Sequence, residues 1–280
     1  MIGIFSGNSK PSSAKDFLQE FVTEVITLEK GGFVYKSRSF EFCVSAFVCD
    51  APARSFTKNV KAHSGYSSCE KCTQTGVWEG RVTFPDIDAV RRTDDTFRLM
   101  EDDEHHKGPS PLEGTSIGMV SQFPLDYMHL VCLGVMRRLL NLWMKGPLRT
   151  RIQSKVVNEI STTLEGLKSC IPIEFARKPR SLEEVNRWKA TEFRQFLIYT
   201  GPIALIGKLS DVLYDNFMLL SVAIFILLNP SLCSLPAYVD YAEKLLILFV
   251  EHYTEVYGKE MVVYNVHGLI HLGCSSRNWC

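Results

Sequence analysis

Residues 42–49, FCVSAFVC, are the stretch of this sequence that most constrains its fold. The run is apolar or small apart from Ser45, it ends at Asp50, and Pro52 follows, which cannot join a central strand. The pattern predicts a buried strand that presents the Asp50 carboxylate at its C-terminal tip, where catalytic and metal-binding residues often lie. The alternative is an ordinary aspartate that caps a turn.

Hydrophobic periodicity divides the rest of the chain into an α/β start and a helical remainder. Before Asp50, the sequence predicts strands over residues 1–7, 33–38 and 40–49, with a helix over residues 14–29. After residue 123 the apolar spacing becomes helical. The helices are predicted over residues 125–143, 152–169, 181–196, 205–214, 217–228 and 237–257.

Four segments follow from this pattern. Residues 1–56 form an α/β core segment, and residues 57–122 form an irregular insert that is too long for a structureless loop and needs a local organiser. Residues 123–272 form a helical region, and residues 273–280 form an atypical tail.

The composition gives weaker indications. The chain has 280 residues with 31 basic and 31 acidic side chains, so no overall field favours nucleic acid or membrane. Nine cysteines without a signal peptide favour a reducing compartment. The apolar run over residues 217–228 is too short to span a bilayer, which predicts a soluble protein with no membrane partner.

Cys69-x-x-Cys72 is the candidate organiser of the insert. Two cysteines at this spacing can occupy two corners of a zinc tetrahedron. The other two ligands must come from elsewhere, and His63 and His106 are the first candidates among His63, His105, His106, His129 and Cys132. A redox pair is the weaker alternative, because the motif lies in a polar loop and not at a βα junction.

Three further positions carry candidate chemistry, each with a structural alternative. Asp126 and His129 are one helical turn apart and could hold a metal or phosphate, although a helix cap explains Asp126 equally. Glu192 lies in a charged helix that salt bridges alone could explain. His267 and His271 have metal-sharing i, i+4 spacing, but packing or phosphate contact is favoured because no glutamate follows His267.

Six segments together resemble the transposases of CACTA-like (En/Spm-type) DNA transposons, most closely their animal branch. The similarity runs from about Ile2 to Leu272. The segments, in order, are GNSKPSS, FVCDAPARSF, GYSSCEKC, FPLDYMHLVCLGVMRRLL, RWKATEFRQFLIYTGP and VYNVHGLIHL.

The resemblance implies a partial ribonuclease-H-like core with a catalytic carboxylate triad and a large helical insertion before the third acid. Asp50 would be the second acid and Glu192 the third. Cys69 and Cys72 match the family's Cys-x-x-Cys. Asp126 and His129 match its Met-His segment and are further candidate catalytic residues.

The implied activity is DNA transposition by two-metal phosphodiester cleavage and strand transfer. Mg²⁺ or Mn²⁺ bound by Asp50 and Glu192 would activate the nucleophile and stabilise the leaving oxygen. A structural Zn²⁺ would be separate from these ions. The implied partners are transposon-end DNA and further copies of the chain, in the nucleus or otherwise in the cytoplasm.

The sequence departs from the family pattern at both ends. The first acid is expected upstream of Met1, and residues 273–280 do not continue the pattern. We therefore expect a fragment that is catalytically inactive alone. One alternative is a domesticated module that binds nucleic acid or protein without cutting, and another is a pseudogene product that does not fold. The binding module would use the basic residues Arg137, Arg138, Arg149, Arg151, Arg177, Lys178 and Arg180.

Overall fold

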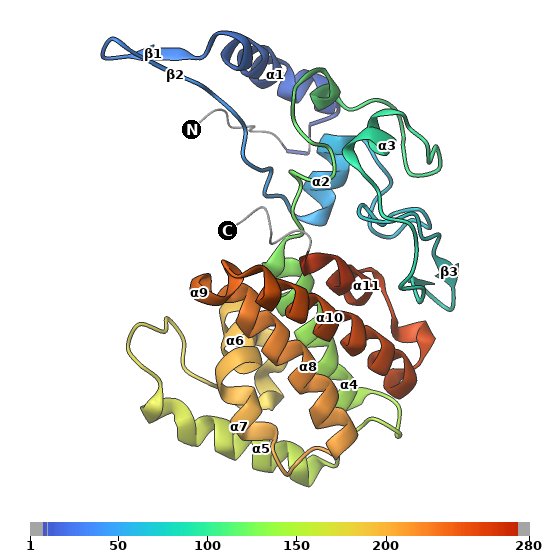
Figure 1. The fold of residues 1–280 in the computed structure, drawn as a ribbon. Coiled ribbons are helices and arrows are strands. Elements are labelled where there is room, and N and C mark those ends of the chain that lie inside the picture. Colours follow the sequence, from blue (N-terminus) through green and yellow to red (C-terminus); the bar gives the residue numbers. More distant parts are fainter. Residues whose placement is uncertain (1–7, 10, 274–280) are drawn as a thin grey trace. The chain divides into compact units, whose positions relative to one another are not determined.

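The computed structural model describes residues 8, 9 and 11–273, and it divides the chain into two units (Figure 1). The first unit contains residues 1–77 and 88–125, and the second contains residues 78–87 and 126–280. Of the described residues 57% are helical, and these residues form two small sheets, so the fold is α/β only in a loose sense. The predicted strand over residues 1–7 and nearly all of the predicted tail lie outside the described residues.

The first unit begins with α1 (Ala14–Gly31), which confirms the predicted helix. The Ser13 side chain accepts a hydrogen bond from the Asp16 amide and caps the helix. At the other end Gly32 has φ +60°, and its amide bonds to the Leu28 carbonyl. A Cβ at Gly32 would lie 2.2 Å from the Phe40 carbonyl oxygen, so glycine is required there.

A short hairpin follows, with β1 (Phe33–Tyr35) antiparallel to β2 (Arg38–Phe40). Lys36 and Ser37 at its tip both have positive φ, as a two-residue turn matched to strand twist requires. The rings of Phe33 and Phe40 stack across the pair, 5.2 Å apart. All six strand residues are exposed, so this hairpin is not a core sheet.

The predicted strand over residues 42–49 is wrong, because this segment has no regular secondary structure. Phe42, Val44 and Phe47 do pack against the core of the unit, as their hydrophobicity requires. The backbone of this segment, however, bonds to Gln122. The Phe47 amide donates to the Gln122 carbonyl, and the Gln122 side-chain amide donates to the Val44 carbonyl. The predicted burial is therefore met only in part, since Cys43, Ser45 and Val48 are exposed. An apolar run also forms a strand only where a neighbouring strand can pair with it.

Asp50 begins a helix and does not end a strand. Its Oδ1 accepts a hydrogen bond from the Ala53 amide at 2.8 Å, which caps α2 (Ala51–Lys58). Pro52 fits in the first turn, where its missing N–H costs nothing. The helix ends at Asn59, whose backbone is left-handed.

The insert is organised by short elements around a small apolar core. β3 (Val77–Trp78) pairs with β4 (Val82–Thr83), and α3 (Asp94–Arg98) and η1 (Pro111–Gly114) follow. Asp94 binds the segment after η1 through the Val120 and Ser121 amides. The buried core of the first unit consists of Val25, Val60, Phe97, Leu112, Ile117, Met119, Val120 and Phe123.

The second unit is a helical assembly, as predicted. Its described helices are η2 (Met128–Met136), α4 (Arg137–Lys145), α5 (Ser154–Gly166), η3 (Leu167–Cys170), η4 (Leu182–Arg187), α6 (Ala190–Gln195), η5 (Phe196–Thr200), α7 (Gly201–Leu205), α8 (Asp211–Leu228), α9 (Pro230–Cys233), α10 (Pro236–Tyr257), η6 (Lys259–Met261), α11 (Tyr264–Gly268) and η7 (Leu269–His271). In Figure 1, α8 and α10 lie side by side. Asn216 of α8 donates to the Phe249 carbonyl of α10 at 3.1 Å.

Three predicted helices are interrupted. The helix predicted over residues 205–214 is broken by a turn at residues 206–210, and its second half belongs to α8. The helix predicted over residues 125–143 is π-helical until Met136 and α-helical only from Arg137. The helix predicted over residues 181–196 breaks at Trp188, which has extended backbone angles. It continues as the π-helical η5 into α7, and so extends beyond the predicted end at residue 196.

One described helix, α8, is long and apolar enough to cross a membrane, and 44% of it is buried inside the protein. Core helices of soluble proteins pass the same test. Its buried face, which includes Phe217, Leu220 and Ile224, serves the core of the second unit.

Candidate metal centre

The two thiols of Cys69-x-x-Cys72 are buried in the first unit, with their sulfur atoms 3.5 Å apart. Two thiolates on a tetrahedral Zn²⁺ at about 2.3 Å from the metal would be about 3.8 Å apart. The observed separation is close to that value. A single hydrogen bond between two thiols would give the same separation, and in that state the hydrogen bond and burial raise the pKa of Cys72.

The thiol loop is held by a short ladder to residues 90–92. Cys72 bridges to Arg91, and the Arg92 amide donates to the Lys71 carbonyl at 3.0 Å. The Arg92 guanidinium also donates to the Cys69 carbonyl and pairs with Asp102. The backbone around both sulfurs is therefore fixed by contacts within its own unit, and such fixed donors favour metal binding.

A buried ion triad anchors the same loop to α2. Glu70, between the cysteines, binds Arg54 at 2.7 Å and Lys58 at 2.9 Å, and all three side chains are at most 3% exposed. Burial alone would raise the pKa of Glu70, but the two cations outweigh it and hold that pKa at about 2. Burial lowers the pKa of Lys58, whose ammonium also lies over the rings of Phe97 and Phe123.

His63 and His106, the two histidines predicted to complete the metal site, differ in their exposure. The His63 side chain is exposed, and its carbonyl accepts a hydrogen bond from Ser68. The His106 ring packs against Phe97, with centroids 4.5 Å apart. His106 therefore belongs to the apolar core of the unit, and its role as a zinc ligand stays a prediction.

His105 is a buried titratable group of this unit. Its Nδ1 lies 2.7 Å from the Ser67 carbonyl, and Nε2 has no hydrogen-bond partner. Burial, with Arg92 as the next cause, lowers the pKa of His105 from 6.5 to about 4. The folded protein therefore keeps this ring neutral at pH values at which the unfolded chain protonates it.

We expect the free energy of unfolding to fall as the pH drops from 6.5 to about 4. Because the pKa of His105 is lowered by folding, the neutral ring contributes its full stabilisation above pH 6.5. This contribution, about 3 kcal/mol in all, is lost as the pH falls below that value. His105→Asn should flatten this part of the stability–pH curve, measured by urea unfolding with hydrogen exchange of residues 97–106. His252→Gln, in the second unit, is the control, and an unchanged slope in His105→Asn would refute the assignment.

A second pair of donors lies in the second unit, on α11 and η7. The Nε2 atoms of His267 and His271 are 3.2 Å apart, and both side chains are buried. Two imidazole nitrogens on one tetrahedral Zn²⁺ would be about 3.3 Å apart. The His267 ring also packs on Phe84, at 5.6 Å, which fixes its orientation. This pair, for which packing was the favoured interpretation, has metal-ligand geometry.

Asp126 and His129 form the predicted i, i+3 pair. Oδ2 of Asp126 bonds Nδ1 of His129, while Oδ1 accepts from the Met128 amide at 2.9 Å. Asp126 is therefore a cap and a histidine partner at once. The pair is partly exposed, and a catalytic role for it stays a prediction.

Glu192 is engaged by arginine. Its carboxylate binds the Arg180 guanidinium through both oxygens, at 2.6 and 3.1 Å, and accepts from the Lys189 amide at 2.8 Å. The side chain is 4% exposed. Binding Mg²⁺ through Glu192 would require it to leave a buried, bidentate ion pair.

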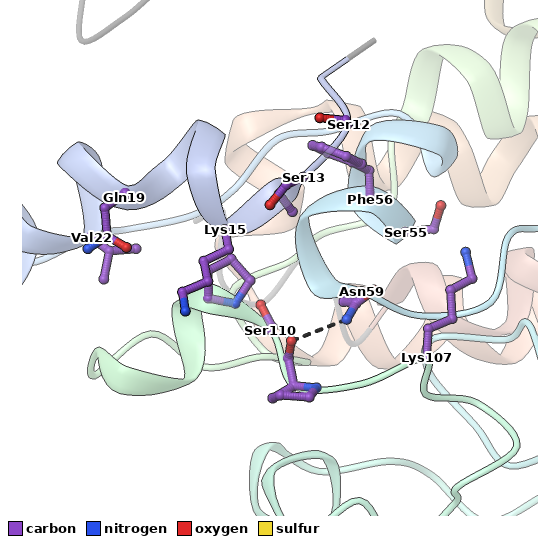
Figure 2. A pocket seen from close by; sticks show the side chains of 13 residues that line it. Ser12, Ser13, Lys15, Gln19, Val22, Ser55, Phe56, Asn59, Lys107 and Ser110 are labelled. Atoms are coloured by element: carbon purple, nitrogen blue, oxygen red, sulfur yellow. Dashed lines mark hydrogen bonds between the residues drawn. The ribbon is translucent and has the colours of Figure 1, made fainter.

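Figure 2 shows a pocket of about 540 Å³ in the first unit, beside the start of α1. Lys15 and Lys107 flank it with exposed side chains. Its inner polar groups already have structural partners: Ser13 caps α1, and Asn59 donates to the Pro109 carbonyl at 3.2 Å. The pocket therefore presents two exposed cations but few free donors for a ligand.

Sequence patterns missed the ion triad of Arg54, Lys58 and Glu70. A signal was present, because Arg54 and Lys58 are four residues apart and share one face of a helix. That signal was hidden by the prediction of a strand and loop in this region. The pairing of Glu70 with α2 depends on tertiary contacts.

Comparisons with protein-family models, curated proteins and solved structures find no match for this chain.

Proposed function

We propose that this chain derives from a DNA transposase of the CACTA-like type, is stabilised by zinc and does not cleave DNA by itself. The proposal rests mainly on the two donor pairs, one of thiols and one of imidazoles, each at the spacing expected for zinc. Both pairs fall in segments that carry the resemblance.

We further propose that Cys69, Cys72, His267 and His271 supply one zinc ion. Each pair alone leaves two positions of a tetrahedron empty, and a structural zinc site is closed by four protein ligands. Phe84, which packs on His267, is only seven residues before Arg91, which bridges to Cys72. The chain therefore links the two pairs by a short connection. The ion would give structure to the long insert and would not take part in cleavage.

The expected lack of activity is supported by the two proposed acids. Asp50 caps α2, and Glu192 is paired with Arg180, so both carboxylates already serve structural roles. Two-metal cleavage needs carboxylates that share a pair of ions about 4 Å apart. A ribonuclease-H-like arrangement of these residues remains part of the proposal.

Plasmid nicking tests this directly. The purified chain, incubated with supercoiled plasmid and Mg²⁺ or Mn²⁺, is expected to give no nicking above the rate of Asp50→Ala. A nicking activity that Asp50→Ala abolishes and Glu104→Ala preserves would show that the chain is a competent nuclease. Glu104 is a suitable control because it is an exposed acid of the same unit.

A second candidate function is that of a domesticated module that binds DNA without cutting it. It is favoured because the carboxylates of Asp50 and Glu192 already have structural partners. Most of the basic residues proposed for it have internal partners: Arg138 reaches Tyr253, Arg149 the Tyr257 carbonyl, and Arg180 binds Glu192. The exposed members are Arg137, Arg149, Arg151, Arg177 and Lys178. Salt-dependent binding of a labelled duplex, measured by fluorescence anisotropy and weakened by Arg137→Gln with Arg151→Gln, would support this candidate.

A further inference from the structure

A groove of about 780 Å³ runs between α8 and α10 on the surface of the second unit. Met218, Leu219 and Val222 line it from α8, and Leu245 and Leu248 line it from α10. The α10 residues follow helical spacing, so they form a continuous ridge facing the groove. Tyr241 and Leu248 are 52% and 48% exposed.

The apolar surface of α8 extends beyond what the core uses. Its core face is buried, while Val212 and Phe225 on other faces are 51% and 45% exposed. A helix that is apolar all round is normally covered all round. A contiguous apolar groove exposed on a protein commonly marks an interaction site.

One end of the groove is acidic. Asp215 of α8 and Glu251 and Glu255 of α10 all line it. The bond from Asn216 to the Phe249 carbonyl brings this part of the two helices together, so the three carboxylates are near one another. No lysine or arginine lines the groove among the residues that the structure describes, and His252 is its one basic side chain there.

We propose that this groove binds an amphipathic helix of a partner protein, with apolar residues on one face and lysine or arginine beside them. The apolar floor would receive side chains at i, i+4 and i+7, as in other helix-in-groove complexes. The acidic end would select basic partners and fix the direction of the bound helix. This inference is independent of the proposed transposase ancestry.

The test uses the full chain and a labelled synthetic peptide as the probe. The peptide carries leucines at i, i+4, i+7 and i+11 and lysines on the flanking positions, and a matched peptide has glutamate at each lysine. Fluorescence anisotropy should show salt-dependent binding of the basic peptide and at least tenfold weaker binding of the acidic one, since about 1.4 kcal/mol corresponds to tenfold.

Two variants separate the apolar and the charged contributions. Leu248→Gln should weaken binding about tenfold or more, while Leu148→Gln, on a residue 82% exposed outside the groove, should leave it unchanged. Glu251→Lys with Glu255→Lys should remove the preference for the basic peptide, and Glu183→Lys should not. These residues are exposed, so circular dichroism should show unchanged folding.

Three results would overturn the proposal. The first is equal binding of both peptides or of neither. The second is a dimer, seen by sedimentation velocity, that Leu248→Gln dissociates, because the groove would then be occupied by a second copy. The third is binding to phosphatidylcholine vesicles that the same substitution abolishes, because the face would then contact lipid.

Discussion

Cys69→Ser is expected to remove bound zinc from this protein and to destabilise the insert. The wild-type chain should carry roughly one zinc ion, the content of a single tetrahedral site. Elemental analysis of the purified full chain measures this directly. His267→Asn should lose the ion as completely as Cys69→Ser, because a site with three protein ligands is no longer closed.

The expected effect is large because metal binding contributes directly to folding. Structural zinc sites in small peptides bind with roughly 10–16 kcal/mol at neutral pH. A protein with two hydrophobic cores depends less on the ion, but chelation should still speed hydrogen exchange in residues 61–76. Cobalt substitution adds a spectroscopic readout, because the thiolate-to-metal absorption should disappear in Cys69→Ser.

The controls use residues of the same kind outside the two pairs. Cys43→Ser and Cys170→Ser change exposed thiols and should leave the zinc content unchanged. Retention of zinc in His267→Asn together with loss in Cys69→Ser would mean that the thiols bind an ion without the imidazoles. Wild-type protein with no zinc after purification in metal-replete buffer would disprove the site.

Glu70→Gln should be the most damaging single substitution in the first unit away from the metal ligands. The glutamine keeps the size of the side chain but leaves Arg54 and Lys58 buried without a counter-charge. Breaking a buried ion pair in this way costs about 3–5 kcal/mol. Faster hydrogen exchange across residues 51–72 would measure the loss.

The charge of Glu70 also predicts an acid limit. Its pKa falls from 4.5 in the unfolded chain to about 2 in the fold, so its stabilisation is complete above pH 4.5. That stabilisation is lost as the pH falls from 4.5 towards 2. Glu70→Gln should therefore show less change in stability across this interval than the wild type.

A triple variant separates charge from shape. Arg54→Met, Lys58→Met and Glu70→Leu together remove all three charges and keep similar volumes, so this variant should be far more stable than Glu70→Gln. Tryptophan fluorescence provides an internal control, since Trp78, Trp143 and Trp188 all fall in the second unit. If Glu70→Gln is as stable as the wild type, the triad does not anchor the loop.

The sequence alone predicted most helices of the second unit and α1, because helical periodicity and caps are local. Ser13 caps the start of α1 and Gly32 caps its end, each through a hydrogen bond to a residue only a few positions away. The Asp126–His129 pair was equally predictable, since a spacing of three residues on a helix brings two side chains together wherever the helix lies. The spacing of each donor pair was also visible in the sequence.

Only the tertiary structure determined the conformation of residues 42–49 and the partners of Glu70 and Glu192. An apolar run specifies burial but not a partner strand, and here Gln122 takes the backbone contacts that a sheet would have made. The partner of Glu192 is Arg180, twelve residues earlier, and the partners of Glu70 are on α2. Such pairings depend on where the chain returns, so periodicity and local spacing could not specify them.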